Sequence, residues 1–191
     1  EGARMKGRDT FKEGPLEDIL DIQYDRYGNG GAVLIREGAH YHTSCNFQNS
    51  SVGGVCCAGG AVASTLSDFV LTECTFVGNH AIYAADTVRA MNSAGGAVYC
   101  IEHGHPTMAD CLFEGNSASE GGAVHLDGDG EATVIGCTFL ANEATDIGRG
   151  GAVYNSSNCT GNLDGCRFLG NTANGWGGAL YAKGAPTDVR G

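Results

Sequence analysis

The clearest pattern in the chain is a short alternation of apolar and mostly polar positions that recurs along most of its length. Cys166 and Phe168, for example, flank the polar Arg167. The Cys-x-Phe pattern occurs five times in all, at Cys45/Phe47, Cys74/Phe76, Cys111/Phe113, Cys137/Phe139 and Cys166/Phe168. Alternation with a period of two is typical of a β-strand with one buried face. We therefore predict a strand at each copy, with cysteine and phenylalanine inside.

A second pattern, Gly-Gly-Ala followed by valine or leucine, alternates with the first. It occurs six times, beginning at Gly30, Gly59, Gly95, Gly121, Gly150 and Gly177. The valine is predicted to face inward, and the glycine pair provides the backbone freedom that a sharp corner needs. Four Cys-x-Phe copies continue as Phe-x-x-Asn-x-Ala, with Ser50 at the asparagine position of the first copy and the asparagines at Asn79, Asn116, Asn142 and Asn171.

Units of this size cannot bury their apolar faces alone, so we predict that they stack as the turns of a solenoid. The expected fold is all-β: a right-handed single-stranded parallel β-helix of five full turns and a partial sixth over residues 29–182. Parallel strands about 4.8 Å apart place equivalent residues on top of one another. We expect stacked phenylalanines (Phe76, Phe113, Phe139, Phe168), an amide ladder at the four asparagines, and a column of buried thiols (Cys74, Cys111, Cys137, Cys166).

Three segments depart from the repeat. Residues 1–28 are predicted to cap the first turn, with a short amphipathic helix or irregular segment over 15–20, and an insertion near 80–94 is predicted to leave the column as a loop. Residues 183–191 are expected to be a tail that leaves the last turn open. Other protein chains, or further turns of the same chain, are expected to cover that edge, so the 191 residues are expected to work inside something larger.

The GGA[VL] and FxxNxA motifs resemble the repeats of polymorphic outer-membrane (Pmp) proteins, which occur in autotransported adhesins and other surface β-helix proteins. The resemblance covers about residues 29–182. It implies an adhesive or surface-structural role and an extracellular, cell-surface or other non-cytosolic location.

Charge narrows the classes of function. The chain has 11 basic and 22 acidic residues, a formal net charge of −11. We therefore expect no nucleic-acid partner, because binding phosphate backbones requires clustered positive charge. No apolar run is long enough to span a bilayer. Three Asn-x-Ser/Thr sequences, at Asn49, Asn155 and Asn158, are glycosylation candidates and favour a secreted setting.

The outward positions beside the buried valines form the candidate binding surface. Tyr99, His125, Tyr154 and Tyr181 are expected to form a row of rings, one per strand, that offers a large contact area to a protein or a glycan. The alternative is an ordinary row of tyrosines on a solvated sheet. These positions provide no paired acids, so we expect a non-catalytic scaffold or adhesion protein with no catalytic residues. A carbohydrate-binding or pectate-lyase-like polysaccharide-degrading protein is the alternative.

Metal binding and disulfides are the remaining chemistry that the sequence raises. A glycine-rich turn holds the candidate Ca²⁺ ligands Asp127, Asp129 and Glu131, with a plain acidic turn as the alternative. The pairs His40/His42 and His103/His105 could each share a strand face, but no third ligand is apparent, so neither a metal nor a cofactor is expected. Outside the thiol column, the better candidates for disulfides are Cys56, Cys57, Cys100 and Cys159.

Overall fold

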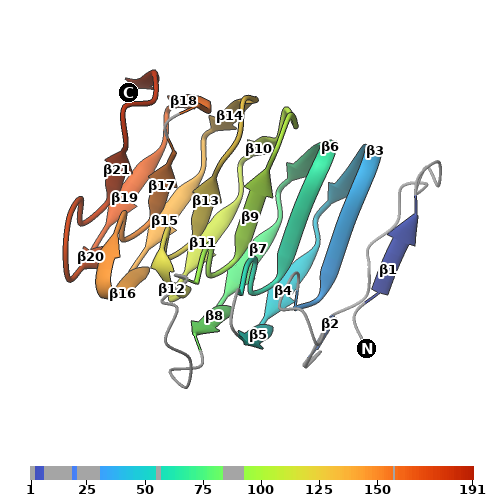
Figure 1. Cartoon of the computed structure of the whole chain (residues 1–191), viewed down its shortest axis with the longest axis horizontal. Helices are drawn as coiled ribbons and strands as arrows, with labels where there is room; N and C mark the ends of the chain where they lie inside the picture. The colour runs from blue at the N-terminus through green and yellow to red at the C-terminus, as the bar shows by residue number, and fades with distance from the viewer. Residues whose placement is uncertain (1–2, 7–18, 21–30, 55–56, 84–92, 157) are drawn as a thin grey trace.

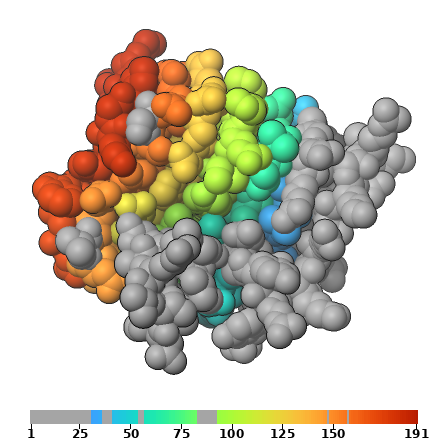
Figure 2. Space-filling model, viewed as in Figure 1, coloured from blue at the N-terminus to red at the C-terminus, as the bar shows by residue number. Residues whose placement is uncertain are grey.

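The computed structural model describes residues 3–6, 19–20, 31–54, 57–83, 93–156 and 158–191. Within these residues every regular element is a β-strand, and each strand pairs in parallel with its equivalent one turn away (Figure 1). The turns follow one another as bands across the molecule (Figure 2). The predicted parallel β-helix is confirmed, with about five stacked turns.

The described strands form three sheets. Sheet A has two limbs joined through the long strand β6. One limb contains β1 (Ala3–Lys6), β3 (Val33–Thr43), β6 (Val62–Thr72), β9 (Val98–Ile101), β13 (Val124–Leu126), β17 (Val153–Asn155) and β21 (Leu180–Ala182). The other limb contains β10 (Thr107–Ala109), β14 (Glu131–Ile135), β18 (Thr160–Asp164) and β22 (Thr187–Arg190).

Sheet B contains β2 (Ile19–Leu20), β4 (Asn46–Gln48), β7 (Thr75–Val77), β11 (Leu112–Glu114), β15 (Thr138–Leu140) and β19 (Arg167–Leu169). Sheet C contains β5 (Ser51–Gly54), β8 (His80–Tyr83), β12 (Ser117–Glu120), β16 (Glu143–Arg149) and β20 (Thr172–Ala173).

The Gly-Gly pair makes one corner of each turn, and each glycine is needed for a different reason. Gly121 has a φ of 65°, in the left-handed region, and an added Cβ would lie 2.2 Å from the Val124 carbonyl oxygen. An added Cβ on Gly122 would lie 2.1 Å from the carbonyl oxygen of Gly151 in the next turn. The first glycine therefore permits the bend, and the second permits the close approach of neighbouring turns.

The interior is filled by equivalent residues on top of one another. Five phenylalanine rings stack with centroid separations of 4.8 to 4.9 Å and interplanar angles of 5 to 6°: Phe47, Phe76, Phe113, Phe139 and Phe168. The first four are completely buried, whereas Phe168, in the last turn, is partly buried. Stacking between turns, rather than packing within a turn, therefore forms this part of the core.

The asparagines form the predicted amide ladder at a second corner. Asn116 Nδ2 donates to Asn142 Oδ1 at 2.9 Å and to the Phe76 carbonyl oxygen at 3.0 Å. The Asn116 backbone N–H donates to the same Asn142 oxygen at 3.0 Å. Asn79 and Asn142 repeat this arrangement with the next turn. Each side chain thus satisfies buried backbone groups in its neighbours, which a corner without regular pairing would leave unsatisfied.

The cysteines at the strand starts form a column of hydrogen-bonded thiols. Cys111 Sγ lies 3.3 Å from the Ala109 carbonyl oxygen and 3.5 Å from the Leu71 carbonyl oxygen, and the equivalent cysteines repeat these contacts. The hydrogen bond with Cys111, together with burial, raises the pKa of Cys74 to about 11. The hydrogen bond with Cys137, together with burial, raises the pKa of Cys111 to about 12. Cys74 and Cys111 are therefore neutral, buried thiols.

The cysteines suggested for disulfides have other environments. Cys100 and Cys159 are buried thiols, and burial raises the pKa of both groups, that of Cys159 to about 11. The Cys57 thiol donates to the Ile82 carbonyl oxygen at 2.9 Å. Cys56 lies outside the described residues. The expectation of disulfides at Cys100 and Cys159 is therefore wrong for this structure.

The segments outside the repeat differ in part from expectation. Ile19 and Leu20 form strand β2, paired in parallel with β4, and are not helical; residues 15–18 lie outside the described part. The insertion begins with strand β8, whereas 84–92 are not described. Residues 183–191 are not simply a tail, because Thr187–Arg190 form β22 in register with β18. Strand β22 could not be predicted from the motifs, because its residues carry neither Cys-x-Phe nor Gly-Gly-Ala.

We expect the two ladders to control stability. Replacing Phe139 by alanine should lower the free energy of unfolding by roughly 3–5 kcal/mol, because the ring has a neighbour on both sides. Replacing Asn142 by alanine should cost roughly 1–3 kcal/mol by leaving buried groups of Asn116 without an acceptor. Denaturant unfolding measures both changes, and a loss below about 0.5 kcal/mol for either would contradict the ladder account.

We expect the cysteines of the thiol column to be reduced and the fold to protect most of them from thiol reagents. In the folded protein, we expect Cys74, Cys111 and Cys137 to react with a thiol reagent only after unfolding, because all three are buried. The raised pKa values of Cys74 and Cys111 also leave these two groups with little reactive thiolate. Cys166, which is partly exposed, should react first. Thiol counts in denaturant without reductant provide the check: fewer reactive thiols than the column's five cysteines (Cys45, Cys74, Cys111, Cys137, Cys166) would show that the column is oxidised.

Candidate functional site

The predicted row of rings lies on adjacent strands β9, β13, β17 and β21. The backbone register pairs Tyr99 with His125, His125 with Tyr154, and Tyr154 with Tyr181. The ring centroids of these successive pairs lie 5.2, 4.5 and 5.5 Å apart. Parallel register thus brings together four rings that are far apart in the sequence.

The expected exposure of this row is wrong at its centre. His125 is 5% exposed and Tyr154 is 4% exposed, whereas Tyr99 and Tyr181 are partly exposed. Burial raises the pKa of Tyr99 and Tyr154, so both phenols stay neutral. Only the ends of the row can offer ring surface to a partner.

A second ladder explains the burial of the row. It consists of the residues directly before each Gly-Gly pair, joined by parallel bridges: Ala58, Ala94, Glu120, Arg149 and Trp176. The glycine corner turns this ladder toward the row. Trp176 and Tyr181 therefore face each other with ring centroids 6.4 Å apart, and Arg149 lies beside Tyr154. The residues of this ladder thus lie against the row, whose centre is buried and not on an open sheet.

At the C-terminal end of this corner, Arg149 links an acid to two rings. Its Nη1 lies 3.1 Å from Glu120 Oε1. Its guanidinium carbon lies 5.0 Å from the Trp176 ring centroid and 6.0 Å from the Tyr181 ring centroid, within the range of cation–π contacts. We call Glu120, Arg149, Trp176 and Tyr181 the arginine–aromatic cluster.

The arginine–aromatic cluster combines a shielded ion pair with an exposed ring. The Glu120 and Arg149 side chains are 14% and 30% exposed, whereas Trp176 is 54% exposed. Bulk water therefore screens the ion pair less than it would a surface pair, and the pair holds Arg149 against the rings. A fixed tryptophan beside a tyrosine and an arginine has the composition of the energetically important residues in protein interfaces.

The sequence contains a second pattern, besides the row of tyrosines, from which this cluster could be predicted. The position before Gly-Gly changes from alanine at 58 and 94 to Glu120, Arg149 and Trp176 in the next three repeats. In a parallel stack, these residues must be cross-strand neighbours, and opposite charges next to an aromatic ring then predict an interacting group. Only the geometry of the corner shows that the same group contacts the tyrosine row.

The candidate Ca²⁺ ligands do not converge. Asp127 Oδ1 accepts a hydrogen bond from Ser156 Oγ at 2.6 Å, and Glu131 Oε1 accepts one from Asn162 Nδ2 at 2.7 Å. Asp129 is exposed and belongs to neither contact. Across the described residues, no group of three or more histidine, cysteine, aspartate or glutamate side chains is arranged to hold a metal ion.

The two predicted histidine pairs do not provide a metal site among the described residues either. His42 is 5% exposed on the inner face of β3, where it pairs in register with Leu71, and the side chain of His40 is not described. His103 and His105 are exposed, and His103 Nδ1 lies 3.8 Å from Asp129 Oδ2. An ion pair at this distance between two exposed side chains contributes little to the free energy of unfolding.

The three glycosylation candidates have different accessibility. Asn155 is completely buried and its Nδ2 donates to Thr187 Oγ1 at 2.8 Å, so the folded chain cannot carry a glycan there. Asn49 and Asn158 are exposed and stay candidates.

Comparison with known proteins identifies the architecture. A family model described as a right-handed β-helix region matches residues 21–187. Neither the curated proteins nor the solved structures that were compared include a match. The match covers most of the chain and agrees with the stacked parallel sheets, but it does not reach the finer Pmp repeat type. Among the described residues, no helix has the length and apolar character to cross a membrane.

His125 should make the protein less stable in acid. Neither ring nitrogen forms a hydrogen bond of normal geometry with the described residues, although the Glu120 backbone lies close to the ring. Burial lowers the pKa of His125 to about 4, against the opposing effects of Asp127 and the Glu120 backbone. Between the usual pKa of about 6.5 and this value, the unfolded chain binds more protons than the folded one, so stability falls as pH falls.

The size of this effect follows from the difference in pKa. The His125 contribution should amount to about 3 kcal/mol, lost between roughly pH 6.5 and pH 4. Denaturant unfolding as a function of pH, compared between the wild type and His125→Gln, isolates it from the carboxylates that titrate in the same range. Parallel stability curves for the two proteins would show that His125 is not shielded as described.

Proposed function

Because the chain belongs to the family of right-handed β-helix proteins, we propose that it is a non-catalytic rigid scaffold for adhesion or interaction. Its contact surface is the arginine–aromatic cluster, and its partner is another protein chain. The observation that carries this proposal is the exposed Trp176 beside a shielded Arg149–Glu120 pair.

The regularity of the column supports a scaffold. The phenylalanine ladder runs without interruption from Phe47 to Phe168, and the asparagine ladder runs from Asn79 to Asn171. Backbone pairing in sheet B follows the same register. A stack of this kind holds its surface residues at fixed spacing and loses little entropy on binding. Trp176 and Tyr181 then offer large, pre-oriented apolar areas with a polar group on the tyrosine and on the tryptophan.

The last turn offers a second contact to another chain. Phe168, Cys166 and Leu180 pack against the core but are only partly buried, unlike their equivalents in earlier turns. β19, β20, β21 and β22 are each the last strand of their sheet or limb, so one more turn of the same repeat would cover these exposed faces and strand edges. We propose that a further turn, from this chain or from another protein, packs there within a larger surface protein or assembly.

A location outside the cytosol belongs to the same proposal. Exposed Asn49 and Asn158 could accept glycans in a secretory compartment. The resemblance to Pmp-type repeats supports the same location, and it supports adhesion over catalysis. The polysaccharide-degrading alternative would need acids and a base on one strand face, and the tyrosine row holds none.

Removing the exposed rings tests the contact surface. The double variant Trp176→Ser/Tyr181→Ser should weaken binding to purified extracellular-matrix and cell-surface proteins, immobilised as a panel, by at least about tenfold, because interface aromatics usually dominate binding energy. Surface-plasmon resonance measures the affinities. The control is Tyr41→Ser, which removes a 60% exposed tyrosine from β3 at the far end of the same sheet.

Two results would contradict the proposal. One is equal binding by the double variant and the wild type when both unfold at the same temperature. The other is release of new reducing ends from a panel of polysaccharides, which would favour the enzymatic alternative.

A further inference from the structure

The asparagine ladder has a direction, and its last member is left with unused donors. Asn142 donates from its backbone N–H and from its Nδ2 to Asn171 Oδ1, at 3.0 and 2.9 Å. Asn171 Nδ2 donates to the Phe139 carbonyl oxygen at 2.9 Å. Among the described residues, nothing accepts from the Asn171 backbone N–H or from its second Nδ2 hydrogen. Each ladder asparagine thus presents donors toward the C-terminal end of the column, and those of Asn171 have no acceptor there.

The carbonyl oxygen of Phe168 lacks the opposite partner. In earlier turns, the asparagine one turn further on donates its Nδ2 to the phenylalanine carbonyl oxygen, as Asn142 does to Phe113 at 2.9 Å. No described asparagine donates to Phe168 in this way. The side chain that completes the ladder must therefore accept from Asn171 and also donate to Phe168.

The first turn shows that a hydroxyl is a poor substitute for the amide. Ser50 takes the ladder position there, and its backbone N–H donates to Asn79 Oδ1 at 3.0 Å. Its Oγ is buried and has no hydrogen-bond partner among the described residues. An aspartate could accept but not donate. Asparagine is the residue that performs both tasks at this corner.

The apolar part of the same end is also incomplete. The Phe168 ring stacks on Phe139 with a centroid separation of 4.9 Å, but it is only partly buried. Val189 is 54% exposed, whereas Leu163, its partner in register one turn earlier, is 1% exposed. A flat ring and a strand in the next turn would bury both residues, as they do in the rest of the column.

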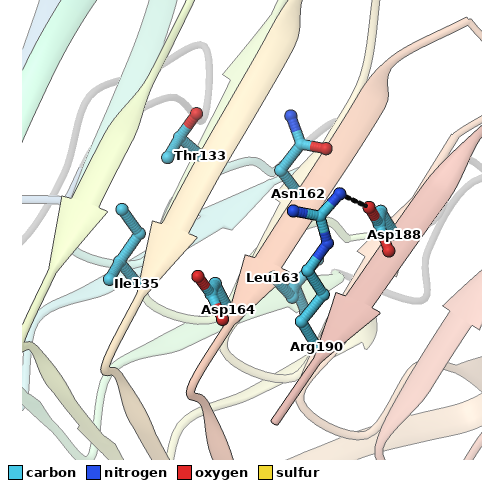
Figure 3. Close-up of a pocket in the computed structure, with 7 residues that line it drawn as sticks. All are labelled: Thr133, Ile135, Asn162, Leu163, Asp164, Asp188 and Arg190. Carbon is cyan, nitrogen blue, oxygen red and sulfur yellow. Dashed lines mark hydrogen bonds and ion pairs between the residues drawn. The ribbon is translucent and has the colours of Figure 1, made fainter.

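The outer rim of this end is polar. Figure 3 shows Asp188 and Arg190 on β22, next to the polar side chains of β18. The two residues form an ion pair, so their charges are balanced without a partner. An apolar centre with a polar rim is the usual arrangement of a protein interface.

The direction of the ladder disfavours a second copy of this chain as the partner. In a two-fold dimer of such ends, the Asn171 donors would face the same donors of the other copy and both would lack acceptors. The N-terminal end of a second copy offers no amide either. Strand β2 pairs Ile19 with Phe47, and the third residue after Ile19 in the sequence is Ile22 instead of asparagine.

We propose that the last turn binds a β-solenoid turn of another protein chain, which carries asparagine at the ladder position and an aromatic residue three positions before it. This inference rests on the further turn in the proposed function and names its chemistry. The asparagine accepts from Asn171 and donates to Phe168, and the aromatic ring stacks on Phe168. By the register of the ladder before Gly-Gly, the same turn lies beside Trp176, so one partner covers the end of the column and the arginine–aromatic cluster.

A peptide of one complete turn, residues 131–156 of this chain, is the probe. It contains β14 to β17, with Phe139 and Asn142 in the required positions. Trp176 is the single tryptophan of the full chain and lies in the last turn, and the peptide contains none. A saturable change in tryptophan fluorescence under reducing conditions should therefore report binding at this end, and calorimetry should give the affinity.

Peptide variants separate the ladder from apolar contact and leave the full chain unaltered. Asn142→Ala should weaken binding about tenfold or more, because the groups of Asn171 and Phe168 are then covered without partners. Glu143→Gln, an exposed position beside the ladder, is the matched control and should leave the affinity unchanged. The same turns joined after Gly191 through a flexible linker repeat the comparison at high effective concentration.

Three outcomes would overturn the inference. Equal binding by the wild-type and Asn142→Ala peptides would overturn it alone, because a turn would then bind without the ladder. No change in Trp176 fluorescence with any turn, free or joined, would overturn it together with the proposed contact of a further turn. A dimer of the full chain that the peptide dissociates would show that this end binds a second copy instead.

Discussion

Parallel, in-register pairing between turns is the constraint on which the rest of this structure depends. Each strand bonds to its equivalent one turn away, so each side chain has its counterparts above and below. A residue that suits one turn must therefore suit a stack of copies. Phenylalanine fits because flat rings stack at the strand spacing, and asparagine fits because an amide can donate to one neighbour and accept from the other.

The same constraint shapes the chemistry of the cysteines. In the column, neighbouring side chains point the same way, which is poor geometry for a disulfide, and thiols bonded to carbonyl oxygens fill the space instead. The raised pKa values of Cys74 and Cys111 follow from contact with the neighbouring thiol and from burial. A sequence with nine cysteines can thus use most of them as small apolar side chains.

Distinctive surface chemistry arises where successive turns differ. In the ladder of residues before each Gly-Gly pair, two alanines are followed by a glutamate, an arginine and a tryptophan. The parallel register places these three side chains next to one another, so they form an ion pair and a cation–π contact. On the other limb, the outward residues change from threonine and isoleucine on β14 to Asn162, Asp164, Asp188 and Arg190 on the last two strands. Both changes lie toward the C-terminal end of the column.

The sequence by itself determined the repeat, the parallel stacking and the identity of the inward residues. Phe76, Asn116 and Cys111 could be placed because a period of two and a recurring motif leave one consistent register. The exposure of the tyrosine row could not be deduced in this way. Whether His125 meets water depends on the angle at the Gly-Gly corner and on Glu120 across it, and a pattern along one strand carries no information about either. Strand β22 was likewise decided by tertiary structure: Thr187–Arg190 lack the repeat motifs and pair because the edge of β18 is available beside them.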